Sequence, residues 1–332
     1  MTRGSARYLA ILACMTFVIA AVATPDERAA VTVATVQFRV TEEAYSSVAA
    51  YRDTVEEIVE RAVNDHSADI VVFPEYLNVF LVAARFPRVV ESASTIEEAL
   101  RLIAAEQVGR DPSGERGQYT NLSALLSSAA EEASAQAIVL WKRLAATHEV
   151  TIVAGTFFVP ADSPHERGLR NRLIVFDETG AVVYEQDKVY LTEEERRDLG
   201  IRPGNLDAAE PVELTGITVG FTICRDTFFD TWHDRLDGSE LWIDLRANGE
   251  PFTPEVRRRF DRTLPDRVRE GGAVAGVNAT LTGSFLDLMW EGRSYAVDDS
   301  GARIAESRRV VGTEITTVEF VPCGESWRLR SR

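Results

Sequence analysis

Blocks of apolar and polar residues alternate along the first half of the chain, and their spacing predicts both strands and helices. Continuous apolar runs rich in β-branched residues predict buried strands at 31–40 and 68–74. Apolar residues at helical spacing predict helices over 46–64, 96–106 and 122–147. Between the last two, the polar and glycine-rich stretch at 109–119 predicts an exposed loop.

The second half returns to strands, with fewer helices between them. Strands are predicted at 150–158, 172–176, 182–186, 217–224, 240–244, 273–277, 294–297 and 302–306, and a charged helix at 253–269. Turns at 177–180 and 299–301 each end in glycine, which suits the positive φ of a hairpin. No repeat and no linker-like break is visible, so residues 29–332 are expected to form a single α/β domain with mixed strands.

The N-terminal segment has the three regions of a secretory signal peptide. Arg3 and Arg7 precede an uncharged apolar run of 16 residues, 8–23, which ends in Ala21-Val22-Ala23. We therefore expect residues 1–23 to be removed and the protein to be exported, to a periplasm or to the outside of the cell. The alternative is a membrane anchor at 8–23, although this run is shorter than the ~20 residues that span a bilayer.

Composition and charge narrow the class of partner. The chain is 45% hydrophobic with a formal net charge of −16, so nucleic acid is an unfavourable partner, as is an anionic membrane surface. Three cysteines are too few for a disulfide scaffold, and no role is assigned to Cys323. The four histidines lack metal-ligand spacing and no glycine-rich phosphate loop is present, so we expect neither a metal nor a cofactor.

Candidate chemistry stands at the ends of three predicted strands. Glu75 follows Val71-Val72-Phe73-Pro74, Lys188 follows the second strand of the first hairpin, and Cys224 ends Gly220-Phe221-Thr222-Ile223. Rigid scaffolds often present reactive groups at such positions. Taken singly, each has a simpler interpretation: a carboxylate that caps a turn, a solvated lysine and a small core residue.

Together, these residues resemble the nitrilase superfamily of carbon–nitrogen hydrolases. The resemblance spans about 31–306 and includes Gln37, the segment at 151–158, Asn171, Pro203-Gly204, and the closing stretch at 291–301. It implies an α-β-β-α sandwich of the nitrilase type, a small-molecule amide as substrate, and assembly into homodimers or higher homo-oligomers.

The chemistry of the three side chains agrees with the mechanism that the resemblance implies. Cys224 would be the nucleophile, since a thiolate attacks carbonyl carbon better than other side chains do near neutral pH. Glu75 would accept the thiol proton and pass it to the leaving amine. Lys188 and the backbone N–H of Arg225 would stabilise the oxyanion.

The resemblance also implies a second glutamate a few residues after the lysine. Glu193, Glu194 and Glu195 all stand there; Glu195 aligns best, because a Glu-Arg pair often closes this stretch in the family, and Glu194 is the fallback. The simpler interpretation is that all three are a solvated helix start.

The residues after the nucleophile bear on the substrate. Cys224-Arg225-Asp226 resembles the Cys-aromatic-Asp of amide-cleaving members more than the Cys-Trp-Glu of nitrile-cleaving ones, with Arg225 as the departure. We interpret the Arg225 side chain as paired with Asp226 or another acid.

Alternatives remain open at this stage. They are a nitrile hydrolase, an N-acyltransferase that uses the same thioester, a catalytically dead ligand-binding member, and a Cys224–His233 protease dyad. The sequence also leaves open which amide is cleaved and whether residues 79–147 form a lid.

Overall fold

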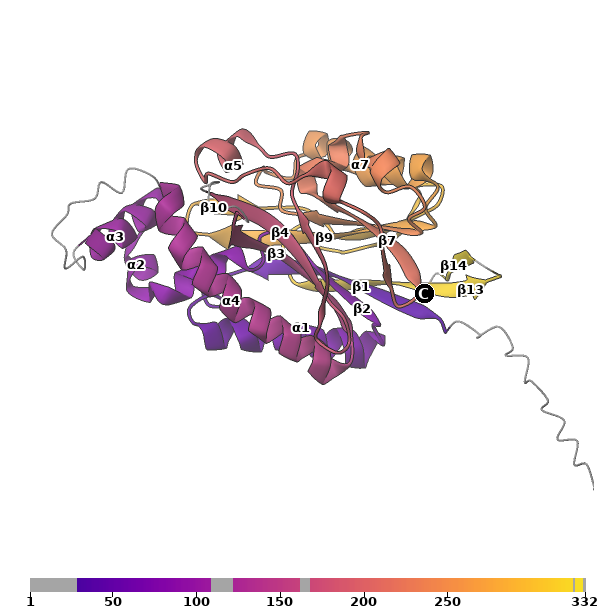
Figure 1. Cartoon of the computed structure of the whole chain (residues 1–332), viewed down its shortest axis with the longest axis horizontal. Coiled ribbons are helices and arrows are strands. Elements are labelled where there is room, and N and C mark those ends of the chain that lie inside the picture. The colour runs from indigo at the N-terminus through magenta and orange to yellow at the C-terminus, as the bar shows by residue number, and fades with distance from the viewer. Residues whose placement is uncertain (1–28, 109–121, 162–167, 325, 331–332) are drawn as a thin grey trace, which may run out of the picture.

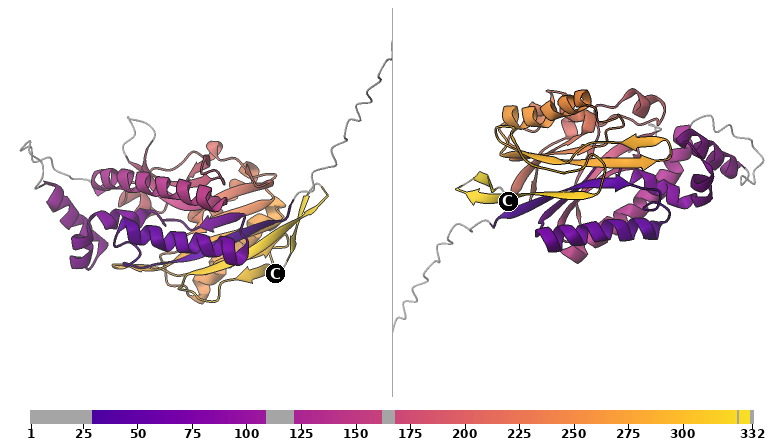
Figure 2. Two further views of the ribbon diagram at one scale, coloured as in Figure 1. Left: turned by 90° about the horizontal axis from the view of Figure 1, so that it is seen from below. Right: turned by 180° about the vertical axis from the view of Figure 1, so that it is seen from behind.

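The computed structural model describes residues 29–108, 122–161, 168–324 and 326–330, and these build four layers (Figure 1). Two β-sheets lie face to face. Helices α1 (Val48–His66) and α4 (Leu122–His148) cover the outer face of one sheet, and α7 (Pro254–Gly271) covers the outer face of the other (Figure 2). This confirms the α-β-β-α sandwich expected from the sequence. The predicted signal peptide and the predicted loop at 109–119 lie outside the described residues.

The first sheet extends from β5 at one edge to β14 at the other. Its order is β5-β4-β3-β2-β1-β13-β14, with bounds β1 (Val31–Val40), β2 (Ile70–Phe73), β3 (Thr151–Pro160), β4 (Leu169–Phe176), β5 (Val182–Asp187), β13 (Glu314–Cys323) and β14 (Ser326–Arg330). Strands β1, β2 and β3 run parallel, as expected for strands joined through α1 and α4.

The second sheet meets the first at one corner. Its order is β6-β7-β8-β9-β11-β12, with bounds β6 (Val212–Leu214), β7 (Ile217–Ile223), β8 (Leu241–Arg246), β9 (Ala275–Phe285), β11 (Tyr295–Asp298) and β12 (Arg303–Glu306). The far end of β9 pairs with the end of β1, where Phe38 stands opposite Leu281, and with β10 (Leu288–Trp290).

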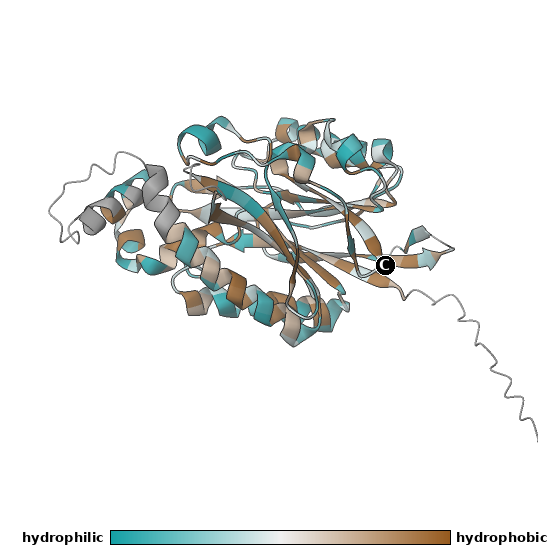
Figure 3. Ribbon diagram, in the orientation of Figure 1, coloured by the Kyte–Doolittle hydropathy of each residue, from teal (hydrophilic) through white to brown (hydrophobic). Residues whose placement is uncertain are grey.

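Alternation along the strands creates separate cores on either side of each sheet. On β1, Val33 faces the space between the sheets, where it shares a cluster with Phe221 of β7, whereas Val36 faces the helices and shares a cluster with Trp141 of α4. A third cluster packs α7 against the second sheet. Figure 3 shows hydrophobic residues concentrated on the strands. Strands with both faces covered read as continuous apolar runs, which is why they were visible in the sequence.

The length of strand β9 is the main error of the sequence-based prediction. The predicted strand at 273–277 stops where polar residues begin, but β9 continues to Phe285. Its polar side chains are buried and hydrogen-bonded: Asn278 donates to Thr280, and the Thr282 hydroxyl donates to the Phe38 carbonyl. Residues 278–280, whose Asn-Ala-Thr sequence ended the predicted strand, thus lie in the buried part of β9.

The segment after β2 forms several short helices at one end of the sandwich. They are η1 (Val79–Arg85), α2 (Pro87–Ser92) and α3 (Ile96–Val108), which lie beside α4 (Figure 1). Of the helices that the structure describes, none is both long and apolar enough to cross a membrane.

Candidate active site

The predicted site residues come from four elements, and each stands at or just after a strand end or within a short helix. Glu75 follows β2 by two residues, and Lys188 follows β5 directly. Glu195 lies in α5 (Glu193–Arg197), and Cys224 is the first residue of the 3-10 helix η3 (Cys224–Phe228), directly after β7. The fold thus brings together segments that are far apart in the sequence.

A buried lysine joins two carboxylates. Lys188 Nζ lies 2.7 Å from Glu75 Oε1 and 2.8 Å from Glu195 Oε1, and the three side chains are no more than 3% exposed. Glu193 and Glu194 are exposed, so of the three candidate glutamates it is Glu195 that reaches the lysine. Buried charges of this kind persist only when paired.

The geometry of α5 explains why Glu195 turns inward. Thr192 caps the helix: its hydroxyl accepts the Glu195 N–H at 3.2 Å, and Glu195 Oε2 accepts the Thr192 N–H at 2.7 Å. This capping box holds Glu195 by one oxygen and leaves the other for Lys188.

Two further residues complete the cluster. Asn171 on β4 donates to Glu75 Oε1 at 2.9 Å, and the Tyr76 hydroxyl donates to Glu195 Oε1. Asn171 belonged to the sequence resemblance, whereas Tyr76 was not recognised. Its position directly after Glu75 was the available signal.

The charges of the cluster shift the pKa values of its members in different directions. Burial raises the pKa of Glu75 to about 7, and the negative charge of Glu195 adds to this while Lys188 opposes it. Burial would also raise the pKa of Glu195, but Lys188 and the Tyr76 hydroxyl lower it below its usual value. For Lys188, burial favours the neutral form, but the two carboxylates outweigh it and raise the pKa. The cluster can therefore exchange a proton near neutral pH, and Glu75 is the member whose pKa is raised into that range.

Cys224 stands at a strained turn beside this cluster. Its φ is +50°, a left-handed conformation that is uncommon for residues other than glycine. Burial and the charge of Glu75 raise the pKa of its thiol, and the charge of Lys188 lowers it. The thiol therefore lies within electrostatic range of Glu75 and Lys188, and the residue keeps some accessible surface.

Asp226 ties the turn after Cys224 to the segment after Lys188. Its buried carboxylate accepts the backbone N–H groups of Val189 at 3.2 Å and of Tyr190 at 2.7 Å. The interpretation of Arg225 as an ion-pair partner of Asp226 was wrong: Arg225 is exposed and lies over the Phe229 ring at 5.9 Å, and within the described residues it forms no ion pair. A buried carboxylate satisfied by backbone N–H groups has no need of the guanidinium.

The histidine considered as an alternative partner for Cys224 contacts other side chains. His233, the alternative partner for Cys224, has its ring nitrogen 2.8 Å from Arg267 and 3.3 Å from Glu270. In the part of the chain that the structure describes, no group of His, Cys, Asp and Glu has the arrangement of a metal site.

The comparisons with known proteins agree with this fold. The family model described as carbon-nitrogen hydrolase matches residues 32–253, a range that contains Glu75, Lys188, Glu195 and Cys224. The chain therefore belongs to the carbon–nitrogen hydrolase (nitrilase) family.

Among solved structures, the chain is similar to a carbon-nitrogen hydrolase from Helicobacter pylori, with a TM-score of 0.63 and 15% identity over 88% of this chain and 89% of that one. It is also similar to an amidase from Nesterenkonia sp., with a TM-score of 0.59 and 18% identity over 88% and 92% of the two chains. A mutant of that amidase was solved in complex with butyramide, with a TM-score of 0.59, 18% identity and coverage of 87% and 90%. No curated protein sequence matches the chain.

Proposed function

We propose that the protein hydrolyses the C–N bond of a small amide through a thioester on Cys224. The observation that carries the proposal is the buried Glu75–Lys188–Glu195 chain of ion pairs, whose charges act on a thiol held at a strained turn. Perturbed titratable groups that converge on a nucleophile are typical of active sites.

The first half-reaction is acylation of the thiol. Because the pKa of the thiol is raised, it is protonated at rest and needs a base. Glu75 Oε2 is buried and has no hydrogen-bond partner among the residues that the structure describes, so it is free to take the thiol proton as sulfur bonds to the carbonyl carbon. Glu75 then gives this proton to the amide nitrogen as the C–N bond breaks, and the amine leaves.

Lys188 is placed to stabilise the oxyanion. An ammonium group has three N–H donors, and two of them point to Glu75 and Glu195, which leaves one for the substrate oxygen. The Arg225 N–H is in the first turn of η3, where a helix supplies no acceptor of its own. Such donors each lower a barrier by ~3 kcal/mol.

The second half-reaction returns the enzyme to its starting state. Glu75 accepts a proton from water as the water oxygen bonds to the thioester carbon. The tetrahedral intermediate then expels the Cys224 sulfur, which takes the proton back from Glu75. The acid product leaves, and no cofactor is consumed.

Release of ammonia or amine from a mixed amide panel, followed by mass spectrometry, tests the proposal. Fluoroacetamide serves as a covalent probe, because a mutant of the amidase from Nesterenkonia sp. was solved with the acetamide moiety of fluoroacetamide added at the active-site cysteine. We expect Cys224→Ala to abolish both turnover and labelling. Cys323→Ala is the matched control, since Cys323 is exposed on β13 and should leave both unchanged. Turnover by Cys224→Ala of any amide that the wild type cleaves would overturn the proposal. Butyronitrile beside butyramide in the panel separates an amidase from a nitrile hydrolase.

We further propose that the protein is exported and that it forms homodimers. Support comes from the signal-peptide pattern at 1–23 and from the family. An N-terminal sequence at or near Thr24 on exported protein supports export, and an intact Met1 or Thr2 on membrane-extracted protein favours the anchor. A mass near one chain in light scattering at micromolar concentration contradicts the dimer.

A further inference from the structure

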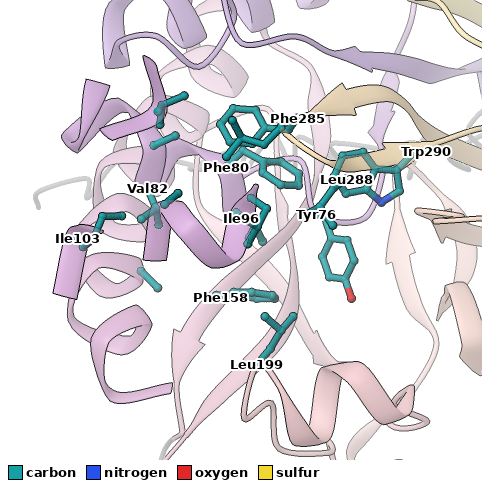
Figure 4. Close-up of a pocket in the computed structure, with 16 residues that line it drawn as sticks. Tyr76, Phe80, Val82, Ile96, Ile103, Phe158, Leu199, Phe285, Leu288 and Trp290 are labelled. Atoms are coloured by element: carbon teal, nitrogen blue, oxygen red, sulfur yellow. The ribbon is translucent and has the colours of Figure 1, made fainter. Parts of the chain in front are cut away.

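A partly open, almost wholly apolar cavity borders the polar cluster at Tyr76. Sixteen residues line a volume of about 160 Å³ (Figure 4), and none of them is charged. They come from η1, α2, α3 and α4, from β3, β9 and β10, and from the connecting segments that hold Tyr76, Leu199 and Leu286. Besides Tyr76 they include Phe80, Phe158, Phe285, Leu288 and Trp290. We call this cavity the apolar chamber.

Tyr76 borders both the apolar chamber and the active site. Its ring faces the chamber and packs edge-on against Phe158, with centroids 5.8 Å apart. Lys188 Nζ lies 5.7 Å from the centroid of the same ring, and the hydroxyl donates to Glu195. Figure 4 shows this hydroxyl directed away from Phe80 and Phe285. One side chain therefore contacts both the reacting groups and the apolar space.

The size and lining of the chamber define what fits in it. An apolar cavity of ~150 Å³ stays dry and binds benzene, so a cavity of this size takes one six-carbon group. The Tyr76 hydroxyl is already used by Glu195, so the chamber offers a polar group little compensation for lost hydration.

We propose that the apolar chamber binds the acyl side of the amide, so that the substrate class is amides of apolar acids with about six acyl carbons, aliphatic or aromatic. This inference rests on the proposed amide hydrolysis. The chamber is assigned to the acyl group because this group stays bonded to Cys224 between the two half-reactions. The departing amine regains its hydration in water, which this chamber cannot replace.

Acyl-chain length is the first test. In the series acetamide, butyramide, hexanamide and decanamide, kcat/KM should rise about fourfold per methylene, equivalent to ~0.8 kcal/mol, until the chamber is full near hexanamide. It should not rise further at decanamide. N-Hexylacetamide has the same carbons on the amine side and should gain little over N-methylacetamide.

Two matched variants locate the effect. Leu288 lines the chamber and Leu102 on α3 does not, and both side chains are 38% exposed. Leu288→Asn should lower the ratio of hexanamide to acetamide kcat/KM by about tenfold, or ~1.4 kcal/mol. Leu102→Asn should leave the ratio unchanged.

Binding separates failure of this inference from failure of the proposed function. Hexanamide should bind the Cys224→Ala protein more tightly than acetamide does in calorimetry, whether or not the wild type turns it over. If hexanamide binds in this way and no amide is hydrolysed, the result supports an acyl-binding chamber and overturns the proposed amide hydrolysis. Equal binding of the two amides, a flat acyl series, or a steeper gain on the amine side overturns the inference.

Discussion

Lys188 Nζ lies 2.7 Å from Glu75 Oε1, and this pair is closed off from solvent, with side-chain exposures of 2% and 0%. A second carboxylate, Glu195, contacts the same nitrogen from the other side. The cluster therefore holds two carboxyl groups and one ammonium group that are almost entirely buried. Its charge balance, as well as its shape, should govern stability and activity.

Loss of the lysine should destabilise the fold as well as the chemistry. Lys188→Met leaves the buried Glu75 and Glu195 without a positively charged partner, which typically costs about 3–5 kcal/mol. The double variant Lys188→Met/Glu195→Gln removes one of the two orphaned charges, so it should recover much of the lost stability. It should remain inactive because the oxyanion still lacks its cation. Urea unfolding and amide turnover measure the two effects, and a double variant no more stable than the single would contradict this account.

The pH dependence of activity should follow Glu75. Because burial raises the pKa of this carboxyl to about 7, kcat/KM should rise with pH through an apparent pKa near 7, as the base form becomes populated. Glu195→Gln removes a negative charge that raises this pKa, so the rising limb should move to lower pH. Glu194→Gln, on an exposed neighbour in the same helix, should not move it. An identical profile in all three proteins would exclude Glu75 as the titrating base.

The same pKa sets a dependence of stability on pH. The pKa of Glu75 is higher in the folded protein than the ~4.3 of an unfolded chain. Its contribution to stability is therefore fully present below pH ~4 and is lost as the pH rises through about 7. Glu75→Gln lacks this titration, so the difference in melting temperature, wild type minus variant, should fall between pH 4 and 8. A constant difference would contradict the raised pKa.

Gly155 should be indispensable for placing Glu75. It lies at an irregularity in the pairing of β3 with β4, has φ +72°, and a Cβ there would lie 2.3 Å from the Pro74 carbonyl oxygen. Gly155→Ala must push the Pro74-Glu75 segment away, so it should lower both stability and kcat/KM.

Gly238 supplies the matched control for that variant. Its φ is +79°, and a Cβ would meet nothing within 4 Å. Gly238→Ala should lower the free energy of unfolding only by the added backbone strain, ~1–2 kcal/mol, and should leave kcat/KM unchanged. Equal effects of the two substitutions on kcat/KM would show that the contact with Pro74 does not matter.

The sequence predicted the parts of the site that local patterns determine. Strands buried on both faces read as apolar runs, so the ends at Glu75, Lys188 and Cys224 could be located. Their convergence depends on tertiary pairings such as β2 with β3 and β7 with β8. The local pattern does not predict these pairings, so the expected convergence came from the family resemblance. Resemblance also favoured Glu195, but only the capping box shows why Glu195 and not Glu194 turns inward.

Other features depend on contacts that no local pattern carries. Strand β9 was cut short because Asn278 and Thr280 are polar, and their hydrogen bonds inside the core are tertiary. The strands β13 and β14 were not predicted, since β13 becomes a strand by pairing with β1, almost three hundred residues earlier. The apolar chamber needs residues from both halves of the chain, so its lining was visible only as scattered hydrophobic positions.

The φ of +50° at Cys224 also limits how this enzyme could evolve. A left-handed backbone is a severe outlier for a β-branched side chain, whereas an unbranched one is accommodated at a smaller cost. Serine could therefore replace the cysteine sterically, but threonine could not. The handedness of one peptide turn thus excludes one of the three common hydroxyl and thiol nucleophiles from this position, whatever substrate the surrounding pocket is selected to accept.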